Sequence, residues 1–378
     1  MNETTHRIEH NPLSALYLAF ELGNKKWRLG FTIGLGQRPR ERTIMAADLV
    51  AFQEEIRLAK KRFGLPQTAR VMSCYEAGRD GFWLHRYLLS KDIENLVVDS
   101  ASIEVNRRAK RAKTDHLDVA KLLTMLVRYD YGEKKVWSVV HAPSPEAEDK
   151  RHLHRQLTTR KVDRTRHTNR IKGLLVGQGV RMPVGADFLE RLDQVCLWDG
   201  SALPKGLRSR LGWEYACLQF VNQQIKELEA GRSEAIRTSD DPSVEKVRQL
   251  MRLGGIGDNS AWLFVMEFFG WREFRNRRQV GGLSGLTSTP YQSGDESQEQ
   301  GIDKAGNCPV RTMAVEIAWG WLRYQPQSEL SRWYQRRFGH GGKRMRKIGI
   351  VALARKLLVA FWRYLEYGEI PAGAQLKA

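Results

Sequence analysis

Hydrophobic positions in the first third of the chain change between the spacing of strands and the spacing of helices. Residues 16–32 form two apolar runs around a glycine-containing turn, which predicts a hairpin. Helical spacing over 46–63 and 82–89 then alternates with short apolar runs at 70–75 and 95–99. The order β-β-α-β-α-β-α predicts a layered α/β domain, which we place at residues 1–145.

The middle of the chain, residues 146–243, has no strand spacing and predicts long polar helices. Residues 150–172 carry nine lysines or arginines and one acid, and their apolar stripe is thin, so most of this helix is free to meet phosphates. Apolar residues every three or four positions over 215–236 are typical of a coiled coil. This spacing leaves open whether the partner helix belongs to the same chain or to a second copy.

The last region, residues 244–378, is predicted to be a mainly helical domain with two glycine-rich breaks. Residues 253–257 lie between two helical patterns; their backbone amides can hold a DNA phosphate, and a plain turn between helices fits them equally well. Residues 281–294 are rich in small hydroxyl side chains and predict a long loop. A helix is expected over 310–324.

The charge of the chain points to a polyanionic partner. Sixty-two lysines and arginines against 43 acids give a net charge of +19, far more than solubility requires. No stretch has the length and apolar character of a membrane span or a secretory signal, and the basic residues do not form one amphipathic anchor. The four cysteines have no CxxC spacing, so neither a zinc site nor a disulfide framework is indicated.

Four acidic residues are candidates for a metal site. Glu21 and Glu76 lie near the ends of predicted strands, while Asp115 and Asp118 are three residues apart on one helix face. Functional groups collect at the carboxyl ends of strands in α/β sheets, so the four carboxylates are expected in one cleft. Such like charges repel unless a cation neutralises them, and their oxygens suit Mg²⁺. Solvated glutamates and a helix-capping aspartate pair are the alternative.

Three clusters of basic residues are candidates for nucleic-acid contact. One immediately precedes the aspartate pair, one covers the basic helix of the middle region, and one lies near the C-terminus among aromatic residues. The expected contacts are Arg107, Arg108, Lys110, Arg111, Lys113, Arg151, Arg155, Arg160, Lys161, Arg164, Arg170, Lys172, Arg336, Arg337, Lys343 and Arg344.

Ser293, in the second glycine-rich break, is the candidate nucleophile. A serine hydroxyl can attack a phosphodiester and keep the cut end as an ester, so a chain with both this serine and a metal site can break and rejoin DNA. Composition alone gives Ser293 no priority over Ser284, Ser288 or Ser297.

Nearly the whole chain resembles the IS110 insertion-sequence transposases, also called DEDD transposases. The stretches that carry the resemblance are AFEL at 19–22, YEAGRDGFWL at 75–84, RAKTDHLD at 111–118, TPYQSG at 289–294 and GIDKAGN at 301–307. Together these motifs are highly specific. The chain departs from the family pattern at Glu21, where the usual residue is Asp.

The resemblance implies a fold and a mechanism. It implies an N-terminal RuvC-like (RNase H-like) domain whose four acids bind Mg²⁺, a helical connector, and a C-terminal transposase domain with Ser293 as nucleophile. It further implies DNA at the element ends and at the target as substrate, a structured bridge RNA as guide, and a dimer or tetramer in which acids and serine from different subunits meet. The expected location is the prokaryotic cytoplasm, at the nucleoid.

Two other functions fit the same residues. A metal-only junction endonuclease would use the acids to activate water, and replacing Ser293 would leave it active. A nucleic-acid-binding protein without catalysis would be permitted by the charge alone, and replacing Asp115 or Asp118 would then change no chemistry.

Overall fold

The computed structural model describes residues 15–78, 81–103, 115–293 and 296–377. They fall into two compact units, the first ending at Ala142 and the second beginning at Pro143. Within the described ranges, no helix combines the length and the apolar character that crossing a bilayer requires.

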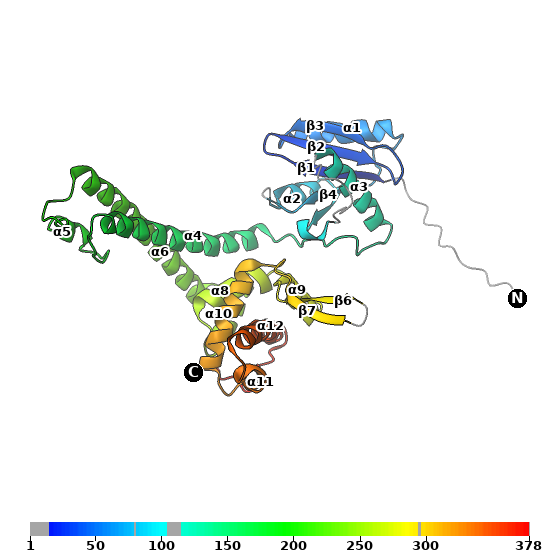
Figure 1. The fold of residues 1–378 in the computed structure, drawn as a ribbon. Coiled ribbons are helices and arrows are strands. Elements are labelled where there is room, and N and C mark those ends of the chain that lie inside the picture. The colour runs from blue at the N-terminus through cyan, green and yellow to red at the C-terminus, as the bar shows by residue number, and fades with distance from the viewer. Residues whose placement is uncertain (1–14, 79–80, 104–114, 294–295, 378) are drawn as a thin grey trace. The chain divides into compact units, whose positions relative to one another are not determined.

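A five-stranded mixed sheet forms the centre of the first unit, in the order β3-β2-β1-β4-β5. The strand β2 (Lys26–Thr32) pairs antiparallel with both of its neighbours, β1 (Leu16–Leu22) and β3 (Arg40–Met45). The strands β4 (Val71–Glu76) and β5 (Glu94–Val98) continue the sheet parallel to β1 (Figure 1). The predicted hairpin and the predicted α/β class are therefore confirmed.

The sequence pattern did not predict the edge strand β3, so the predicted order of elements lacks one strand. Only Arg40 and Ile44 are buried along this strand, and the remaining residues are polar or exposed. An edge strand carries few buried side chains and commonly carries charges, so it lacks the apolar alternation that sequence patterns detect.

Helices cover both faces of the sheet. The helices α1 (Leu49–Arg62) and α2 (Trp83–Leu89) pack on the face that carries Leu16, Leu18 and Phe20 of β1. Helix α3 (Asp115–Asp130) packs on the opposite face, against Tyr17 and Ala19. A short 3-10 turn, η1 (Ser100–Ser102), follows β5.

Two long helices lie side by side at the start of the second unit (Figure 1). They are α4 (Pro145–Val176) and α6 (Lys205–Thr238), and the short α5 (Phe188–Leu192) lies between them in sequence. The stripe at 215–236 packs within the same chain, because Val221 and Ile225 of α6 contact Leu157 of α4. The stripe therefore pairs α6 with α4 of the same chain, and a coiled-coil geometry for this pair stays a prediction.

The rest of the second unit is a mainly helical core, as predicted. Its longest helix is α12, whose buried residues include Leu357 and Phe361; the ring of Phe361 packs against Phe264 and Trp321. The helical elements are α7 (Pro242–Met251), α8 (Asp258–Phe264), η2 (Val265–Phe269), α9 (Arg277–Leu283), α10 (Cys308–Tyr324), α11 (Glu329–Tyr334), η3 (Gln335–Gly339) and α12 (Lys343–Tyr367).

The segment predicted as a long loop at 281–294 is instead the end of α9 followed by a β-hairpin. The strands are β6 (Ser288–Ser293) and β7 (Glu296–Ile302), paired antiparallel. Backbone hydrogen bonds hold such a two-stranded ribbon, and its polar sequence, with Ser and Gln on both strands and Glu on β7, shows no apolar alternation. The loop prediction was wrong for that reason.

The glycine-rich turn at 253–257 uses most of its amides inside the protein. The amide of Gly254 donates to the Gln375 carbonyl at 3.0 Å, and that of Gly257 donates to the Ser260 hydroxyl at 3.2 Å. The Ile256 amide donates to the Leu253 carbonyl at 3.1 Å. The structure therefore favours the plain interhelical turn over a phosphate-binding loop.

Candidate catalytic and nucleic-acid-binding sites

Glu21, the next-to-last residue of β1, and Glu76, the last residue of β4, lie at the ends of neighbouring parallel strands. Phe20 of β1 is in register with Tyr75 of β4, and each glutamate is the next residue on its strand. Side chains alternate along a strand, and Ala19 and Cys74 both pack toward α3. Glu21 and Glu76, two residues further along each strand, therefore belong to the α3 face as well.

Helix α3 runs antiparallel to β1, which brings its aspartate end toward these glutamates. At its other end, the Tyr17 hydroxyl donates to Asp130 at 2.7 Å, and Arg70 donates to the same carboxylate at 2.8 Å. Val119 lies against Gly30, which is in register with Ala19. Asp118, one residue before Val119, is therefore at the end of the helix that faces the ends of β1 and β4.

The register and the packing of α3 direct three of the four predicted acids toward one end of the sheet, but not into a closed group. Glu21, Glu76 and Asp118 share one face and one end of the unit, and Asp115 begins the same helix. Arg28 lies opposite Glu21 in the β1–β2 ladder and pairs with Glu41 at 2.9 Å. Across the described ranges, no three His, Cys, Asp or Glu side chains are grouped closely enough to hold a metal ion by themselves. Magnesium binding stays a prediction.

Gly30 allows α3 to lie directly on the sheet. A Cβ at this position would lie 2.2 Å from Val119 Cγ1 and 3.0 Å from Leu123 Cδ1, and the β-branched Val119 has little freedom to move away. We expect Gly30→Ala to cost about 1–3 kcal/mol of folding stability and to lower DNA cleavage, because α3 and Asp118 must shift. Urea unfolding and a cleavage assay on the purified variant measure both effects.

Gly34 provides the matched control for this substitution. A Cβ at Gly34 would come no closer than 3.9 Å to another atom, the hydroxyl oxygen of Tyr131. Gly34→Ala should therefore leave stability and cleavage close to those of the parent protein. Equal unfolding midpoints for the two variants would contradict the close contact at Gly30.

Ser293 is the last residue of β6, in register with Glu296 of β7. The Asp303 amide closes the base of this hairpin by donating to the Thr287 carbonyl at 2.9 Å. The Asn307 amide donates to the carbonyl of Leu283, the last residue of α9, at 2.8 Å. A Cβ on Gly306 would lie 2.3 Å from that Leu283 carbonyl oxygen, so only glycine fits. The GIDKAGN motif therefore anchors the hairpin that carries Ser293.

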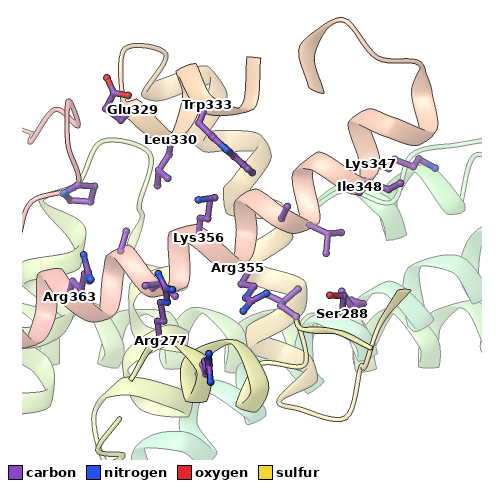
Figure 2. Close-up of a pocket in the computed structure, with 18 of the residues that line it drawn as sticks. Arg277, Ser288, Glu329, Leu330, Trp333, Lys347, Ile348, Arg355, Lys356 and Arg363 are labelled. Carbon is purple, nitrogen blue, oxygen red and sulfur yellow. The ribbon is translucent and has the colours of Figure 1, made fainter. Parts of the chain in front are cut away.

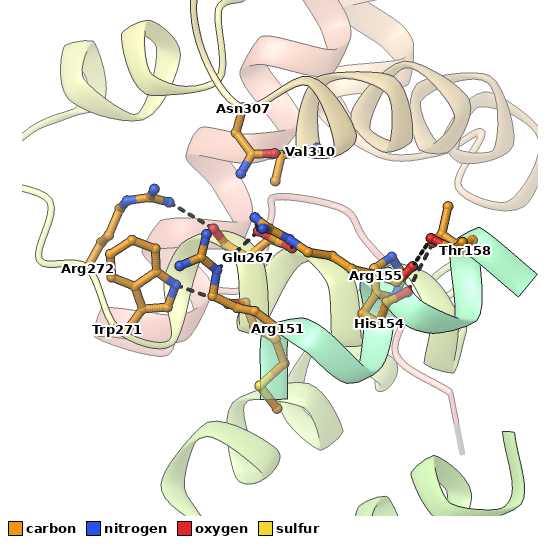
Figure 3. A network of polar contacts seen from close by, with 11 residues as sticks. Arg151, His154, Arg155, Thr158, Glu267, Trp271, Arg272, Asn307 and Val310 are labelled. Atoms are coloured by element: carbon orange, nitrogen blue, oxygen red, sulfur yellow. Dashed lines mark hydrogen bonds and ion pairs between the residues drawn. The ribbon is translucent and has the colours of Figure 1, made fainter. Parts of the chain in front are cut away.

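Arg151 and Arg155, which are predicted to contact nucleic acid, bond to a buried glutamate. Glu267 of η2 is fully buried, and Arg155 bonds to its two oxygens at 2.6 and 3.0 Å (Figure 3). Arg151 bonds to it at 3.3 Å and stacks on Trp271. Burial tends to raise the pKa of Glu267, but the hydrogen bonds and charges of the arginines outweigh it and lower that pKa. These contacts give both arginines a partner inside the protein, and their contact with nucleic acid stays a prediction.

The other predicted cations of α4 lie on its surface, several in ion pairs. Arg160 pairs with Asp163, Lys161 with Glu229 and Arg170 with Glu214. Such exposed pairs are weak and exchange readily for phosphate. Within the described part of the chain, Arg164 and Lys172 are exposed and have no ion-pair partner. The candidate residues Arg107, Arg108, Lys110, Arg111 and Lys113 lie outside the described residues.

The C-terminal candidates are exposed, but the aromatic residues between them are largely core. Arg336, Arg337, Lys343 and Arg344 all face solvent, whereas Tyr334 and Phe338 are buried. The mixture of basic and aromatic residues in the sequence therefore reflects a helix that buries its aromatic side and exposes its charged side. Trp333 is the exception, because it lines an open groove.

This groove is a basic surface that the sequence interpretation missed. It has a volume of about 1280 Å³ and runs along α12, with α11 on one side and α9 and the β6–β7 hairpin on the other (Figure 2). Among the predicted nucleic-acid contacts in the described residues, only Arg344 lines it. Four of its remaining cations are spread along α12, and the other three, Arg277, Arg278 and Lys304, come from separate segments of the chain.

Comparisons with known proteins agree on one kind of relative. The model of a family described as "Transposase IS116/IS110/IS902 family" matches residues 247–333, which include the β6–β7 hairpin. The chain is 39% identical over 380 residues to "Putative transposase y4rJ" of Sinorhizobium fredii, covering 97% of this chain and 95% of that protein. It is 27% identical over 236 residues to "Transposase for insertion sequence element IS1328" of Yersinia enterocolitica, covering 61% of this chain and 68% of that protein.

Proposed function

The chain belongs to the IS116/IS110/IS902 family of insertion-sequence transposases, and we propose that it cuts and rejoins DNA with Ser293 as the nucleophile. The observation that carries the proposal is the register of β1 with β4 and the packing of α3 on them, from which we infer that Glu21, Glu76 and Asp118 lie toward one end of one sheet face. The strand order, three antiparallel strands followed by two parallel ones, supports a RuvC-like first domain.

The acids of the first unit are suited to hold Mg²⁺ together with the substrate. Glu21, Glu76, Asp115 and Asp118 would supply carboxylate oxygens, the ligands that Mg²⁺ prefers. At phosphoryl-transfer sites this ion is held by one or two carboxylates plus phosphate oxygens and water, so a closed cage of protein ligands is not required. When bound, Mg²⁺ supplies a positive charge that stabilises negative charge on the reacting phosphate.

The serine of the second unit supplies the covalent step. The Ser293 hydroxyl oxygen attacks the phosphorus atom in line, loses its proton, and forms a phosphoserine ester while the bond to one strand oxygen breaks and that oxygen leaves as a hydroxyl. A hydroxyl of a second strand then attacks the ester and restores the Ser293 hydroxyl. One phosphoester bond forms for each that breaks, so strand exchange needs no ATP.

A guide RNA and an oligomeric assembly complete the proposal. The exposed cations of α4, among them Arg164 and Lys172, form a surface that suits a structured RNA. The acids and Ser293 belong to different units, which fits an assembly in which one subunit's acids work with another subunit's serine.

The test is covalent attachment of DNA in cells that carry the gene with its natural flanking DNA. After denaturation, DNA should remain bound to the wild-type protein and be absent from Ser293→Ala. Ser297→Ala, a change in the partner strand of the same hairpin, should keep the attachment. DNA cut by both wild type and Ser293→Ala without attachment would establish a metal-only nuclease instead. Cutting by neither would leave a nucleic-acid-binding protein.

A further inference from the structure

The groove along α12 carries far more positive than negative charge. Eight lysine and arginine side chains line it, against the two carboxylates of Glu329 and Glu369. Among the lining residues that the structure describes, one cation is paired with one of these acids: Arg363 lies 3.7 Å from Glu369. Cations gathered around one groove repel each other, and an anionic ligand that spans them relieves this repulsion.

The positions of the cations fit a chain of phosphates rather than one phosphate. Lys347, Arg355 and Arg363 follow each other along α12 at intervals of eight residues, which is slightly more than two helical turns, or about 12 Å of rise per interval. Figure 2 shows Lys347 and Arg363 toward opposite ends of the groove, with Arg355 between them. A small anion would contact one of these sites, whereas a polynucleotide backbone can reach all three.

The floor of the groove is apolar and offers a ring for stacking. Leu330, Ile348, Val351 and Val359 lie between the cations, and the Trp333 indole faces α12 with the Lys356 ammonium 4.6 Å from its ring centroid (Figure 2). Duplex DNA presents phosphates but keeps its base faces stacked inside. A groove that combines a cationic rim with an aromatic and aliphatic floor matches unpaired nucleotides, whose bases need an apolar surface.

We infer that this groove binds a single-stranded polynucleotide segment, with phosphates on Lys347, Arg355 and Arg363 and a base on Trp333. The inference rests on the proposed function and extends it. One wall of the groove contains Ser288 and Gln300 of the β6–β7 hairpin, so the bound strand lies beside the element whose far end is Ser293. Cleavage and exchange both expose unpaired strand ends, which need such a surface.

The experiment measures fluorescence anisotropy of labelled oligonucleotides with the full-length protein carrying Ser293→Ala, so that no strand is cut. Single-stranded DNA, single-stranded RNA of the same sequence and the DNA duplex are compared. Trp333→Ala should weaken single-strand binding about five- to a hundredfold and leave its salt dependence unchanged. Lys347→Ala combined with Arg363→Ala should reduce the slope of log K against log salt by about 1.4, or 0.7 for each lost phosphate contact.

Matched controls separate the groove from general effects of charge or folding. Trp319→Ala removes a half-exposed tryptophan outside the groove, and Arg237→Ala combined with Arg323→Ala removes two exposed cations outside it. Both controls should bind single strands as the parent does. Groove variants that match their controls, or that lose duplex binding as strongly as single-strand binding, would overturn the inference.

The anisotropy measurements also show whether the groove binds DNA or RNA, and their result does not depend on the proposed catalysis. A loss confined to DNA would assign the groove to a substrate strand, and a loss confined to RNA would assign it to the guide; both support the inference. Because the assay needs no cleavage, retained groove binding together with no covalent attachment at Ser293 would refute the proposed function alone.

Discussion

Replacing Glu21 by Gln should lower DNA strand cleavage about a hundred- to a thousandfold, the usual effect of removing one group that stabilises transition-state charge. The amide has nearly the shape of the carboxylate but no negative charge to hold a cation. Glu21 is at a strand end and only partly buried, so folding stability should change by no more than about 1 kcal/mol. Excision of the element from a plasmid measures cleavage, and urea unfolding measures stability.

Glu21→Asp is the matched control, since it keeps the charge and shortens the side chain by one methylene group. This variant should retain most of the cleavage that Glu21→Gln loses. An equally large loss with Asp would assign the effect to the length of the side chain rather than to its charge. Unchanged cleavage with Gln would remove Glu21 from the site.

The sheet core could be predicted from the sequence, whereas its edges could not. Burial on both faces makes β1 a nearly continuous apolar run, and the buried Trp27, Leu29 and Phe31 alternate along β2, so both strands are visible in the hydrophobic pattern. The edge strand β3 and the β6–β7 ribbon are held mainly by backbone bonds and carry polar side chains. The spacing of hydrophobic residues along the sequence does not reveal backbone pairing between strands whose side chains are not buried.

The candidate acids could be found from the predicted ends of the strands. That they share one face of the sheet could be inferred only from the register of the strands in the structure. Sequence spacing places Glu21 and Glu76 near the ends of two strands without saying which way either side chain points. The pairing of Phe20 with Tyr75 and the packing of Ala19 and Cys74 against α3 supply that information. A slip of one residue in either strand would turn one glutamate to the opposite face.

Charge patterns along the chain predict a basic surface but do not show which cations already have a partner inside the protein. Arg151 and Arg155 belong to a basic run, yet their partner Glu267 lies more than a hundred residues away. The groove shows the reverse case, because Arg277, Lys304 and Arg355 come from separate segments that meet only in the fold. Charge counted along the chain does not show which cations are already neutralised.

Glu267→Gln tests whether Glu267 neutralises Arg151 and Arg155, and it should destabilise the second unit by about 3 kcal/mol. Removing one partner of a buried ion pair leaves the other charge uncompensated, which costs about 3–5 kcal/mol. The lower end applies because the Arg155 side chain is 49% exposed and can be solvated, although that of Arg151 is 12% exposed and cannot turn fully to water. The urea midpoint should fall, and amide exchange in α4 should accelerate roughly a hundredfold.

Acid pH should remove the same stabilisation from the wild-type protein. The pKa of Glu267 is lower in the folded state than its ordinary value of 4.5, so its contribution is complete above that value and is lost as the pH falls through the lower, folded-state pKa. The Gln variant lacks this carboxyl group, so its stability should depend less on acid pH.

Glu245→Gln is the control for the substitution. It breaks an exposed pair with Arg248 and should change stability by less than about 1 kcal/mol. If Glu267→Gln unfolds at the same urea concentration as Glu245→Gln, the buried pair does not stabilise the unit, and Arg151 and Arg155 return to the nucleic-acid candidates.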